Sequence, residues 1–417
     1  MKTYLAIDIG ASSGRHIVSW IEKGVLQTRE VYRFPNEFSE KDGCLCWDAE
    51  GLFAHVVAGL KAACEQGFTP RSIGIDTWAV DYVFLDRQNK MVGDLVAYRD
   101  SRTDGADLYL EKTMAFDVLY RYTGIAKQPF NTIYQMSAAL REHPEYRDMV
   151  DDFLLVPGYL SFRLTGKKAH EWTNASTTAL CSPTTCTWAK EVLDAARLPE
   201  TWFRAPMVQP GTVLGQLLPD IAAAVGFSCD VILPATHDTG SAYMAVPAQD
   251  EQAVFLSSGT WSLLGKELRA PITTERARAA GFTNEGGYGG TTRFLKNIMG
   301  MWMLQCLHKE TGAAHSFADM AQMAQASSYP AYVNAADQRF LAPSSMMAEV
   351  KAALREQGAP EPRVLADVLR AVTMGLAVCY RDAIREMEAI TGQRLTSVNI
   401  VGGGSQNVVL NQMTADV

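Results

Sequence analysis

The chain contains two short stretches of similar design, Ala6-Ile7-Asp8-Ile9-Gly10-Ala11-Ser12-Ser13-Gly14-Arg15 and Phe255-Leu256-Ser257-Ser258-Gly259-Thr260-Trp261-Ser262. Each has the apolar residues of a buried strand, then a glycine turn, then the start of a second strand. When the two are aligned, Gly10 falls on Gly259 and Ser13 falls on Ser262. Glycine lets the backbone approach a bound group closely, and such a turn can direct backbone N–H groups at phosphate oxygens. One turn of this kind in each half of the chain predicts an enzyme that holds ATP.

The composition is that of an ordinary folded protein with two or three domains. The 417 residues exceed what one core usually holds, and 47% hydrophobic residues with 20% charged residues argue against disorder. A net charge of −8 argues against a surface that binds nucleic acid. No apolar run reaches the roughly 18 residues that span a bilayer, and no signal-peptide core follows Met1. We therefore expect no membrane partner and a cytoplasmic location. The eight cysteines are scattered, so we expect them to be reduced thiols.

The first half of the chain has a mixed α/β pattern. Three strands joined by hairpins run to about residue 34, and a helix then begins at the N-cap Asp48 and ends near Gly67. Strands over 73–76 and 80–85 follow, and helices are expected over 108–116, 131–141 and 157–164. A strand over 231–233 then leads into Thr236-His237-Asp238-Thr239-Gly240 and a further helix.

The second half repeats this organisation in a shorter form. Polar residues at 247–252 mark a boundary, which predicts domains over 1–246 and 247–417. One long helix is expected over 364–391, closed by Gly392, and a strand over 398–401 leads into Gly402-Gly403-Gly404 and a helix over 407–413. If the halves are duplicates, the second is shorter than the first, which predicts that its carboxyl end is missing.

Phosphoryl transfer needs phosphate-binding turns, a carboxylate near the metal ion and a base for the incoming hydroxyl. Asp8 ends the first strand beside the glycine turn, where it can hold the water shell of Mg²⁺; alternatively, it only caps the turn. Ser12, Ser13, Arg15 and Thr260 supply hydroxyl and guanidinium donors beside the two turns. Ordinary hairpins also use Ser, Thr and Gly, so the correspondence of the two turns is what favours phosphate binding.

Asp238 lies at a strand-to-helix junction, where it can accept a proton from a substrate hydroxyl as that oxygen attacks the γ-phosphate. The alternative is a helix N-cap, and both roles can hold together. His237 is either a polar substrate contact or a packed, hydrogen-bonded histidine. Trp78 could stack on a sugar, although a buried core tryptophan is the simpler interpretation.

Two further segments carry polar residues or glycines of interest. The three glycines at 402–404 would let an adenine or ribose lie against the backbone. The stretch 296–305 is interpreted as a helix start with methionines in the core, and Asn297 and Gln305 are its polar exceptions.

These residues together resemble the FGGY carbohydrate kinases. The resemblance covers nearly the whole chain and is carried by the segments 8–15, 74–81, 97–102, 237–239, 257–262, 283–287, 295–300 and 401–404. It implies an α/β fold of two actin-like, ribonuclease-H-like domains with an interdomain cleft that closes over ATP and a ketose. The implied reaction transfers a phosphoryl group from ATP to L-rhamnulose, giving ADP and L-rhamnulose 1-phosphate.

The resemblance also implies roles for single residues. Asp238 is the implied catalytic base, and Asp8 is the implied residue near Mg²⁺. The implied ATP contacts are Ala11, Ser12, Ser13, Gly14, Arg15, Thr260, Gln305 and Gly403. The implied sugar contacts are Ala79, His237, Asp238, Thr239 and Asn297.

Two departures from the family pattern bear on these expectations. The relatives usually have glycine at the position of Ala79, and one extra methyl group beside the sugar could change the ketose preference. The relatives also continue past Val417, so a chain that ends there is expected to bind ATP poorly or to be unstable. We expect a monomer or a homodimer.

Two alternatives remain open. One is a kinase for another ketose, such as L-fuculose or xylulose, because sequence does not fix the stereochemistry of a single hydroxyl. The other is an actin-like ATPase or a sugar-binding regulator; the absence of a basic helix-turn-helix before Asp8 disfavours a DNA-binding repressor. A kinase should consume ATP much faster with a ketose than with water alone.

Overall fold

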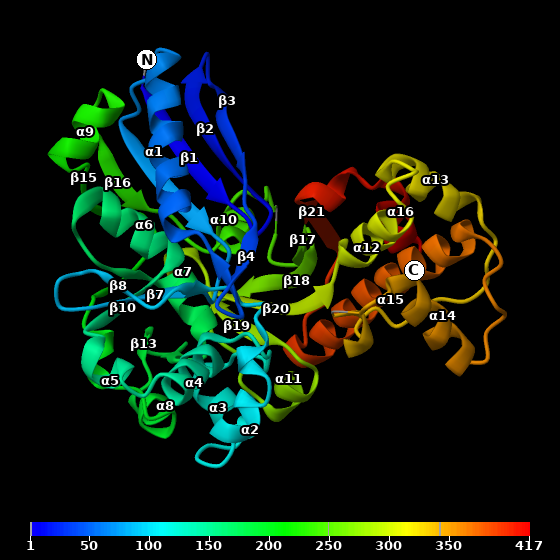
Figure 1. Ribbon diagram of the computed structural model, residues 1–417. Coiled ribbons are helices and arrows are strands. Elements are labelled where there is room, and N and C mark those ends of the chain that lie inside the picture. The colour runs from blue at the N-terminus through cyan, green and yellow to red at the C-terminus, as the bar shows by residue number, and fades with distance from the viewer. Residues whose placement is uncertain (1, 249, 342) are drawn as a thin grey trace. The chain divides into compact units, whose positions relative to one another are not determined.

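The computed structural model describes residues 2–248, 250–341 and 343–417, and it divides into two compact units (Figure 1). Unit 1 consists of Met1–Met244 and Leu268–Arg293, and unit 2 consists of Ala245–Glu267 and Phe294–Val417. The chain passes between the units at residues 244–245, 267–268 and 293–294. Domain bounds of 1–246 and 247–417 stay a prediction, and Gln249 of the boundary stretch lies outside the described residues.

A six-stranded sheet forms the centre of unit 1. Its order is β15-β16-β6-β1-β2-β3. The strand bounds are β1 (Thr3–Ile9), β2 (Ser13–Glu22), β3 (Val25–Pro35), β6 (Ser72–Thr77), β15 (Thr212–Gln216) and β16 (Asp230–Leu233). The hairpins β1–β2 and β2–β3 are antiparallel, whereas β6 runs parallel to both β1 and β16. The three hairpin-joined strands expected at the start of the chain are confirmed.

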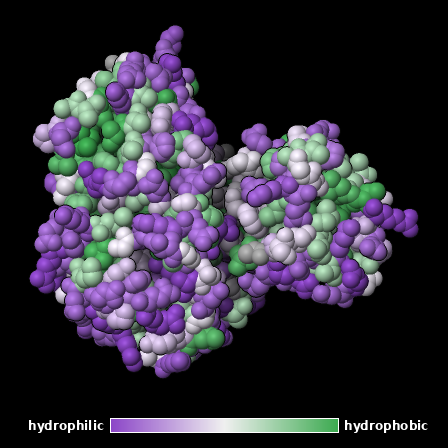
Figure 2. All heavy atoms as spheres, in the orientation of Figure 1, coloured by the Kyte–Doolittle hydropathy of each residue, from purple (hydrophilic) through white to green (hydrophobic). Residues whose placement is uncertain are grey.

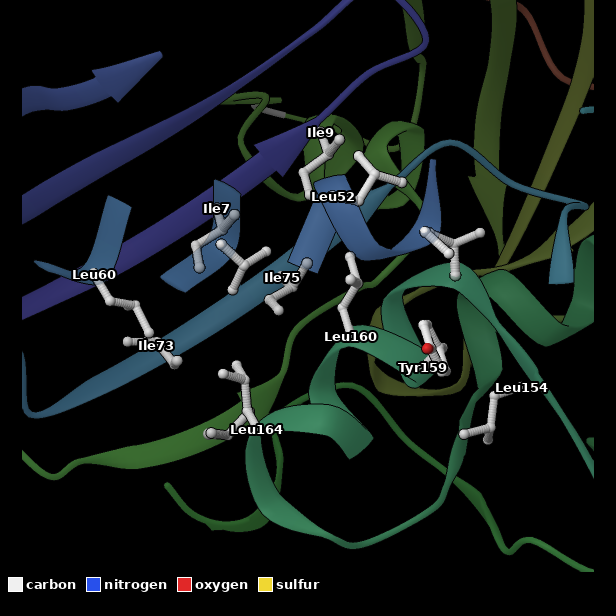
Figure 3. Close-up of a cluster of buried hydrophobic side chains, with 14 of the residues drawn as sticks. Ile7, Ile9, Leu52, Leu60, Ile73, Ile75, Leu154, Tyr159, Leu160 and Leu164 are labelled. Atoms are coloured by element: carbon white, nitrogen blue, oxygen red, sulfur yellow. The ribbon is translucent and has the colours of Figure 1, made fainter. Parts of the chain in front are cut away.

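Two helices, α1 (Ala49–Glu65) and α6 (Val156–Thr165), supply side chains to the core on one face of this sheet. The carboxylate of Asp48 accepts the backbone N–H of Gly51 at 2.8 Å, and Gly67 takes a left-handed φ of 84° just beyond the end of α1. Figure 3 shows α1 and α6 side chains packed against Ile7 and Ile9 of β1 and against β6. Because strand side chains alternate between faces, Asp8 points away from this core.

The rest of unit 1 consists of short strands and helices. The strands are β4 (Phe38–Lys41), β5 (Cys44–Trp47), β7 (Tyr82–Leu85), β8 (Met91–Val92), β9 (Leu95–Val96), β10 (Asp152–Leu155), β11 (His170–Glu171), β12 (Cys181–Ser182), β13 (Thr187–Trp188), β14 (Met207–Val208) and β19 (Thr283–Gly286). The helices are α2 (Ala106–Leu110), α3 (Phe116–Thr123), α4 (Thr132–Glu142), α5 (Tyr146–Met149), α7 (Trp172–Ala175), α8 (Lys190–Ala195), α9 (Pro219–Val225), α10 (Asp238–Met244) and α11 (Glu275–Ala279).

Three predicted helices in this region have different outcomes. The predictions over 131–141 and 157–164 are confirmed by α4 and α6. The prediction over 108–116 is wrong, because α2 ends at Leu110 and α3 begins at Phe116. The hydroxyl of Thr113 donates to the carbonyl of Leu110 at 2.9 Å, so a side chain satisfies a carbonyl at the end of α2.

Unit 2 repeats the strand arrangement of unit 1. Its strands lie in the order β20-β18-β17-β21 of a five-stranded sheet that continues to β19, with β17 (Ala253–Ser258), β18 (Trp261–Leu268), β20 (Thr292–Met299) and β21 (Ser397–Val401). The pair β17–β18 is antiparallel and β17–β21 is parallel, like β1–β2 and β1–β6. The helices are α12 (Trp302–Glu310), α13 (Phe317–Ala326), α14 (Met346–Glu356), α15 (Leu365–Thr391) and α16 (Val408–Asp416).

The long helix predicted over 364–391 is confirmed by α15, and Gly392 follows it with φ 68°. The helix start predicted over 296–305 is wrong in its first part. Lys296 and Asn297 lie in β20, whose apolar neighbours Ile298 and Met299 are buried, and α12 begins only at Trp302. A short apolar run fits a buried strand as well as a helix, and here the sheet pairing decides.

Polar residues cover most of the visible face of each unit, with hydrophobic patches between them (Figure 2). None of the helices in the described ranges combines the length and the hydropathy that a membrane span needs. All eight cysteines are free thiols, as expected.

Candidate active site

The carboxyl ends of three neighbouring strands in unit 1 bring together three aspartates. Asp8 near the end of β1 is the register partner of Asp76 on β6, and both project from the face opposite to Ile7 and Ile75. The backbone N–H of Thr77 donates to the carbonyl of Thr236 at 2.9 Å, which fixes the segment after β16 beside β6. Asp238 follows two residues later. Acidic groups that are distant in sequence thus gather at one edge of the sheet.

Asp76 shows how closely these carboxyls lie. Burial raises its pKa well above the usual range, and the charges of Asp8 and Asp238 raise it further. Asp76 was not among the predicted site residues. A signal was available, because it follows a buried Ile-Gly-Ile strand as Asp8 follows its own apolar strand.

The first glycine turn lies directly beside Asp8. The backbone N–H of Gly10 donates to the carbonyl of Ser13 at 3.0 Å, and the side chain of Asn36 donates to the carbonyl of Gly10 at 2.8 Å. Arg15 donates from Nε to the Asp8 carboxylate at 2.8 Å, and its side chain is 46% exposed. The predicted ATP contacts Ala11, Ser12, Ser13, Gly14 and Arg15 are therefore consecutive residues that run from the turn into β2, and hydrogen bonds to Gly10 fix the turn.

The Asp238 carboxylate is accessible at the start of α10. It keeps 36% of its side-chain surface exposed, and it accepts the backbone N–H of Thr239 at 2.6 Å and the Thr239 hydroxyl at 3.2 Å. Burial raises the pKa of Asp238; the nearby His237 acts against this rise, and the charge of Asp8 adds to it. Asp238 is the first residue of α10 and accepts the N–H of the next residue, which is not the bond of a helix N-cap; the carboxylate is also available to a ligand.

His237 is buried, and one of its ring nitrogens lies near the Asp238 carboxylate. Its Nε2 lies 3.4 Å from Oδ1 of Asp238, while Nδ1 lies 3.3 Å from Oε2 of Glu285 and 3.1 Å from Nη2 of Arg293. Neither Glu285 nor Arg293 was assigned a role from sequence. Both come from 268–293, far along the chain from His237, so only the fold reveals the contact.

A buried carboxylate supports the segment that carries His237 and Asp238. Glu171, 3% exposed, accepts the backbone N–H and the hydroxyl of Thr236 at 2.9 and 2.7 Å. It also accepts the backbone N–H and the hydroxyl of Thr173 at 2.8 and 2.6 Å. Burial raises the pKa of Glu171, and these hydrogen bonds oppose the rise.

The predicted sugar contact Ala79 lies in a constrained loop. The next residue, Val80, has a left-handed φ of 69°, which is costly for a β-branched residue. The buried Asp81 carboxylate accepts the indole N–H of Trp78 at 2.9 Å and that of Trp47 at 2.8 Å. Burial raises the pKa of Asp81 to about 6. Trp78 is therefore a buried, hydrogen-bonded residue, as the simpler interpretation expects.

The second glycine turn, in unit 2, resembles the first with one residue fewer. Ile9 pairs with Gly14 across the first turn, whereas Ser258 pairs with Ser262 across the second. The alignment of Ser13 with Ser262 is therefore wrong by one residue, because equal spacing hid the length difference between the turns. Ser262 is buried and hydrogen-bonded to the Tyr380 hydroxyl at 2.6 Å, so it faces the interior of unit 2.

Three of the remaining predicted contacts lie on elements around this second turn. The carbonyl of Thr260 accepts backbone N–H groups of Gly300 and Trp302 at 3.2 Å, which fastens the start of α12 and hence Gln305 to the turn. Gly403 lies in the loop after β21. A Cβ on Gly402 would lie 2.7 Å from the carbonyl oxygen of Ser258, so this loop also packs against the turn.

Asn297 lies on β20, and its Oδ1 is buried without a hydrogen-bond partner among the described residues. Unit 1 thus brings together Asp8, the first turn, Ala79, His237, Asp238 and Thr239. Unit 2 brings together Thr260, Gln305 and Gly403. Within the described ranges, no group of three His, Cys, Asp or Glu side chains is arranged to enclose a metal ion.

Comparison with protein families matches both halves of the chain. The N-terminal domain of the FGGY family of carbohydrate kinases matches residues 3–245, and its C-terminal domain matches residues 254–417. The rhamnulokinase of Halalkalibacterium halodurans is 43% identical, across 100% of this chain and 88% of its own. That of Oceanobacillus iheyensis is 42% identical (99% and 87%), and that of Bacillus subtilis is 40% identical (99% and 85%).

Solved structures of sugar kinases share the fold. A ligand-bound xylulose kinase from Lactobacillus acidophilus matches with a TM-score of 0.81 at 17% identity, covering 100% of this chain and 84% of its own. A glycerol kinase from Plasmodium falciparum with ADP matches with a TM-score of 0.78 at 14% identity and the same coverage. The predicted fold class, α/β with two actin-like domains, is confirmed.

Proposed function

Because this chain belongs to the FGGY family of carbohydrate kinases, we propose that it transfers the γ-phosphoryl group of ATP to the 1-hydroxyl of L-rhamnulose. The products are ADP and L-rhamnulose 1-phosphate. The choice of ketose is supported by rhamnulokinases that are 40–43% identical over nearly the whole chain. The single observation that carries the proposal is the meeting of Asp238, Asp8 and the first glycine turn at one edge of the unit 1 sheet.

Asp238 is the base in this proposal. Its raised pKa makes the carboxylate a better proton acceptor than an ordinary surface aspartate, and its exposed edge can approach a hydroxyl. It takes the proton of the ketose 1-hydroxyl as that oxygen attacks the γ-phosphorus atom of ATP and the bond to the β-phosphate oxygen breaks. The Thr239 N–H holds the carboxylate in position through its contact with Oδ1.

Asp8 and Asp76 fit a magnesium ion that keeps several of its own ligands. Carboxylate oxygens suit Mg²⁺, which commonly binds to one or two protein carboxylates together with water and substrate phosphates. The two neighbouring carboxyls match that pattern better than a full protein cage. When bound, Mg²⁺ would neutralise charge on the transferred phosphoryl group.

The first turn supplies donors for phosphate oxygens. Ser12 and Arg15 are exposed, so the Ser12 hydroxyl and the Arg15 guanidinium can reorient to donate hydrogen bonds to a bound anion. Thr260, Gln305 and Gly403 are proposed as contacts on the nucleotide side. Oδ1 of Asn297 has no hydrogen-bond partner among the described residues, so it can accept a hydrogen bond from a sugar hydroxyl. Ala79, His237 and Thr239 are the other proposed sugar contacts.

We also propose that the protein works in the cytoplasm, where ATP and phosphorylated sugars are kept. The monomeric or homodimeric state stays a prediction.

A ketose panel tests the substrate. ADP release is followed by a coupled assay with L-rhamnulose, L-fuculose, xylulose and no sugar. We expect the highest kcat/KM with L-rhamnulose and little ADP without a ketose. Equal or better turnover of another ketose would overturn the choice of sugar, and sugar-independent ATP hydrolysis would favour an actin-like ATPase.

The Asp238→Asn variant tests the base. Asparagine keeps the shape and an acceptor for the Thr239 N–H, so we expect kcat to fall by roughly 10²- to 10⁴-fold while ATP affinity changes little. The matched control is Asp220→Asn on α9, which is exposed and away from the strand ends. If Asp238→Asn keeps full activity, as Asp220→Asn should, Asp238 is not the base.

A further inference from the structure

We propose that Arg293 fixes the position of the ring hydrogen on His237, so that Nε2, the ring nitrogen beside Asp238, carries it and Nδ1 accepts a hydrogen bond. Arg293 and Glu285 are then positioning residues that act through His237. The inference concerns unit 1 alone, and it rests on the proposed function only for the meaning of that hydrogen in catalysis.

Arg293 is held rigidly behind His237. Its side chain is fully buried, and Nε donates to the carbonyl of Gly286 at 2.8 Å. Nη2 lies 3.4 Å from the carbonyl of Thr173, and the guanidinium lies 5.8 Å from the centre of the Tyr243 ring. A planar group held on several sides cannot turn away from the imidazole.

The contact between Arg293 and His237 favours one hydrogen arrangement. Nη2 lies 3.1 Å from Nδ1, and guanidinium nitrogens can only donate. If Nδ1 carried a hydrogen, two donors would face each other at this distance. Nδ1 must therefore present its lone pair to Arg293, which leaves the ring hydrogen on Nε2.

Glu285 also lies beside Nδ1, and its carboxylate could accept a hydrogen from that nitrogen. Arg293 is needed to prevent this. Its Oε2 lies 3.3 Å from Nδ1 and 3.2 Å from Nη2 of Arg293. Burial acts to raise the pKa of Glu285, but the charge of Arg293 opposes that rise, and the pKa lies below its usual range. Glu285 thus balances the buried guanidinium charge. Without Arg293, the carboxylate would draw the ring hydrogen to Nδ1.

The result is a division of roles between neighbouring residues. Nε2 lies 3.4 Å from Oδ1 of Asp238, so its hydrogen lies beside the carboxylate and is placed to reach an oxygen atom that binds there. An Nε2 that carries a hydrogen cannot accept the proton of the ketose hydroxyl. Asp238 is therefore the proton acceptor of the pair, and His237 is a donor that can orient a ketose oxygen.

The ring nitrogens can be observed directly. The full chain is labelled with ¹⁵N-histidine, and two-bond ¹H–¹⁵N correlation spectra are recorded at pH 8 without sugar or nucleotide. The His237 signal is assigned by its loss in His237→Gln. We expect one protonated nitrogen, coupled to both carbon-bound ring hydrogens, which identifies it as Nε2. Protonation on Nδ1, or on both nitrogens, overturns the proposal.

Substitution separates Arg293 from a purely structural role. In Arg293→Met we expect the hydrogen to move to Nδ1, where Glu285 accepts it, and kcat/KM for the ketose to fall about tenfold or more while the KM for ATP stays the same. In Glu285→Gln we expect Nε2 to stay protonated. The control Arg276→Met, on the exposed part of α11, should leave the His237 spectrum unchanged.

A second variant covers the case in which Arg293→Met is unstable. Arg293→Met leaves the Glu285 carboxylate buried without its partner, so the double variant with Glu285→Gln is measured beside it. An unchanged Nε2 hydrogen in Arg293→Met, when that variant is folded, refutes the role of Arg293. Because the spectra are recorded without substrate, they do not depend on which ketose is phosphorylated. A wrong choice of ketose would change the result of the ketose panel only.

Discussion

Replacing Glu171 by glutamine should destabilise unit 1 and loosen the segment that carries the proposed base. Among the described residues, Oε2 of this carboxylate accepts three hydrogen bonds, from the Thr236 N–H and from the hydroxyls of Thr236 and Thr173, whereas Oε1 accepts only the Thr173 N–H. A glutamine would place its carbonyl where the three donors converge. Its NH₂ group would then face the Thr173 N–H.

The cost follows from this arrangement. One buried backbone N–H loses its acceptor, which costs about 1–3 kcal/mol, and the three bonds that remain lose the strength of a charged acceptor. Against a total stability of about 5–15 kcal/mol for a typical domain, Glu171→Gln should still fold. We expect a lower kcat as well, because Thr236 precedes His237 and Asp238 directly.

Urea denaturation measures the free energy of unfolding, and the coupled assay measures kcat. The matched control is Glu50→Gln. Glu50 bonds Arg163 at 2.6 Å, but its side chain is 67% exposed, and an exposed ion pair contributes only about 0–1 kcal/mol. Equal losses of stability in the two variants, or no loss in Glu171→Gln, would refute the reasoning.

Three further predictions address other parts of the molecule. His170 is 1% exposed, both ring nitrogens lack a partner among the described residues, and burial lowers its pKa to about 3. In the unfolded chain His170 binds a proton below about pH 6.5, whereas in the folded chain it stays neutral until about pH 3. The free energy of unfolding therefore falls as the pH drops from about 6.5 toward 3. At pH 4.5, denaturant titrations of His170→Phe should show that it avoids roughly 2–3 kcal/mol of this loss in the free energy of unfolding. The same pH dependence of stability with and without the substitution would count against the prediction. Gly300→Ala puts a Cβ 2.7 Å from the carbonyl oxygen of Gly259, so the KM for ATP should rise in the coupled assay. The idea fails if that KM is unchanged. Asp81→Asn weakens the support of the loop that holds Ala79, so the KM for the ketose should rise and that for ATP should not. Parallel changes in both KM values would contradict a local role.

The local spacing of apolar and capping residues was sufficient to predict much of the secondary structure. The helix capped by Asp48 and the helix closed by Gly392 lie where apolar spacing and capping residues predict them. Local pattern failed where two elements compete for one stretch. The apolar run that contains Ile298 reads as a helix start, but pairing within the unit 2 sheet makes it a strand.

The candidate site divides in the same way. Asp8 and Asp238 could be found because Asp8 lies at the end of a predicted strand and Asp238 lies shortly after one, where side chains in an α/β fold meet ligands. Glu171, Glu285 and Arg293 could not be assigned, because each acts on the segment 236–238 from a distant part of the sequence.

The sequence by itself determined the strands, the glycine turns and the acidic residues at the strand ends, because these depend on side-chain period and on backbone freedom within a few residues. Only the tertiary structure decided which buried charges surround His237. Hydrogen positions and proton affinities depend on distances of about 3 Å between groups that the chain brings together by folding.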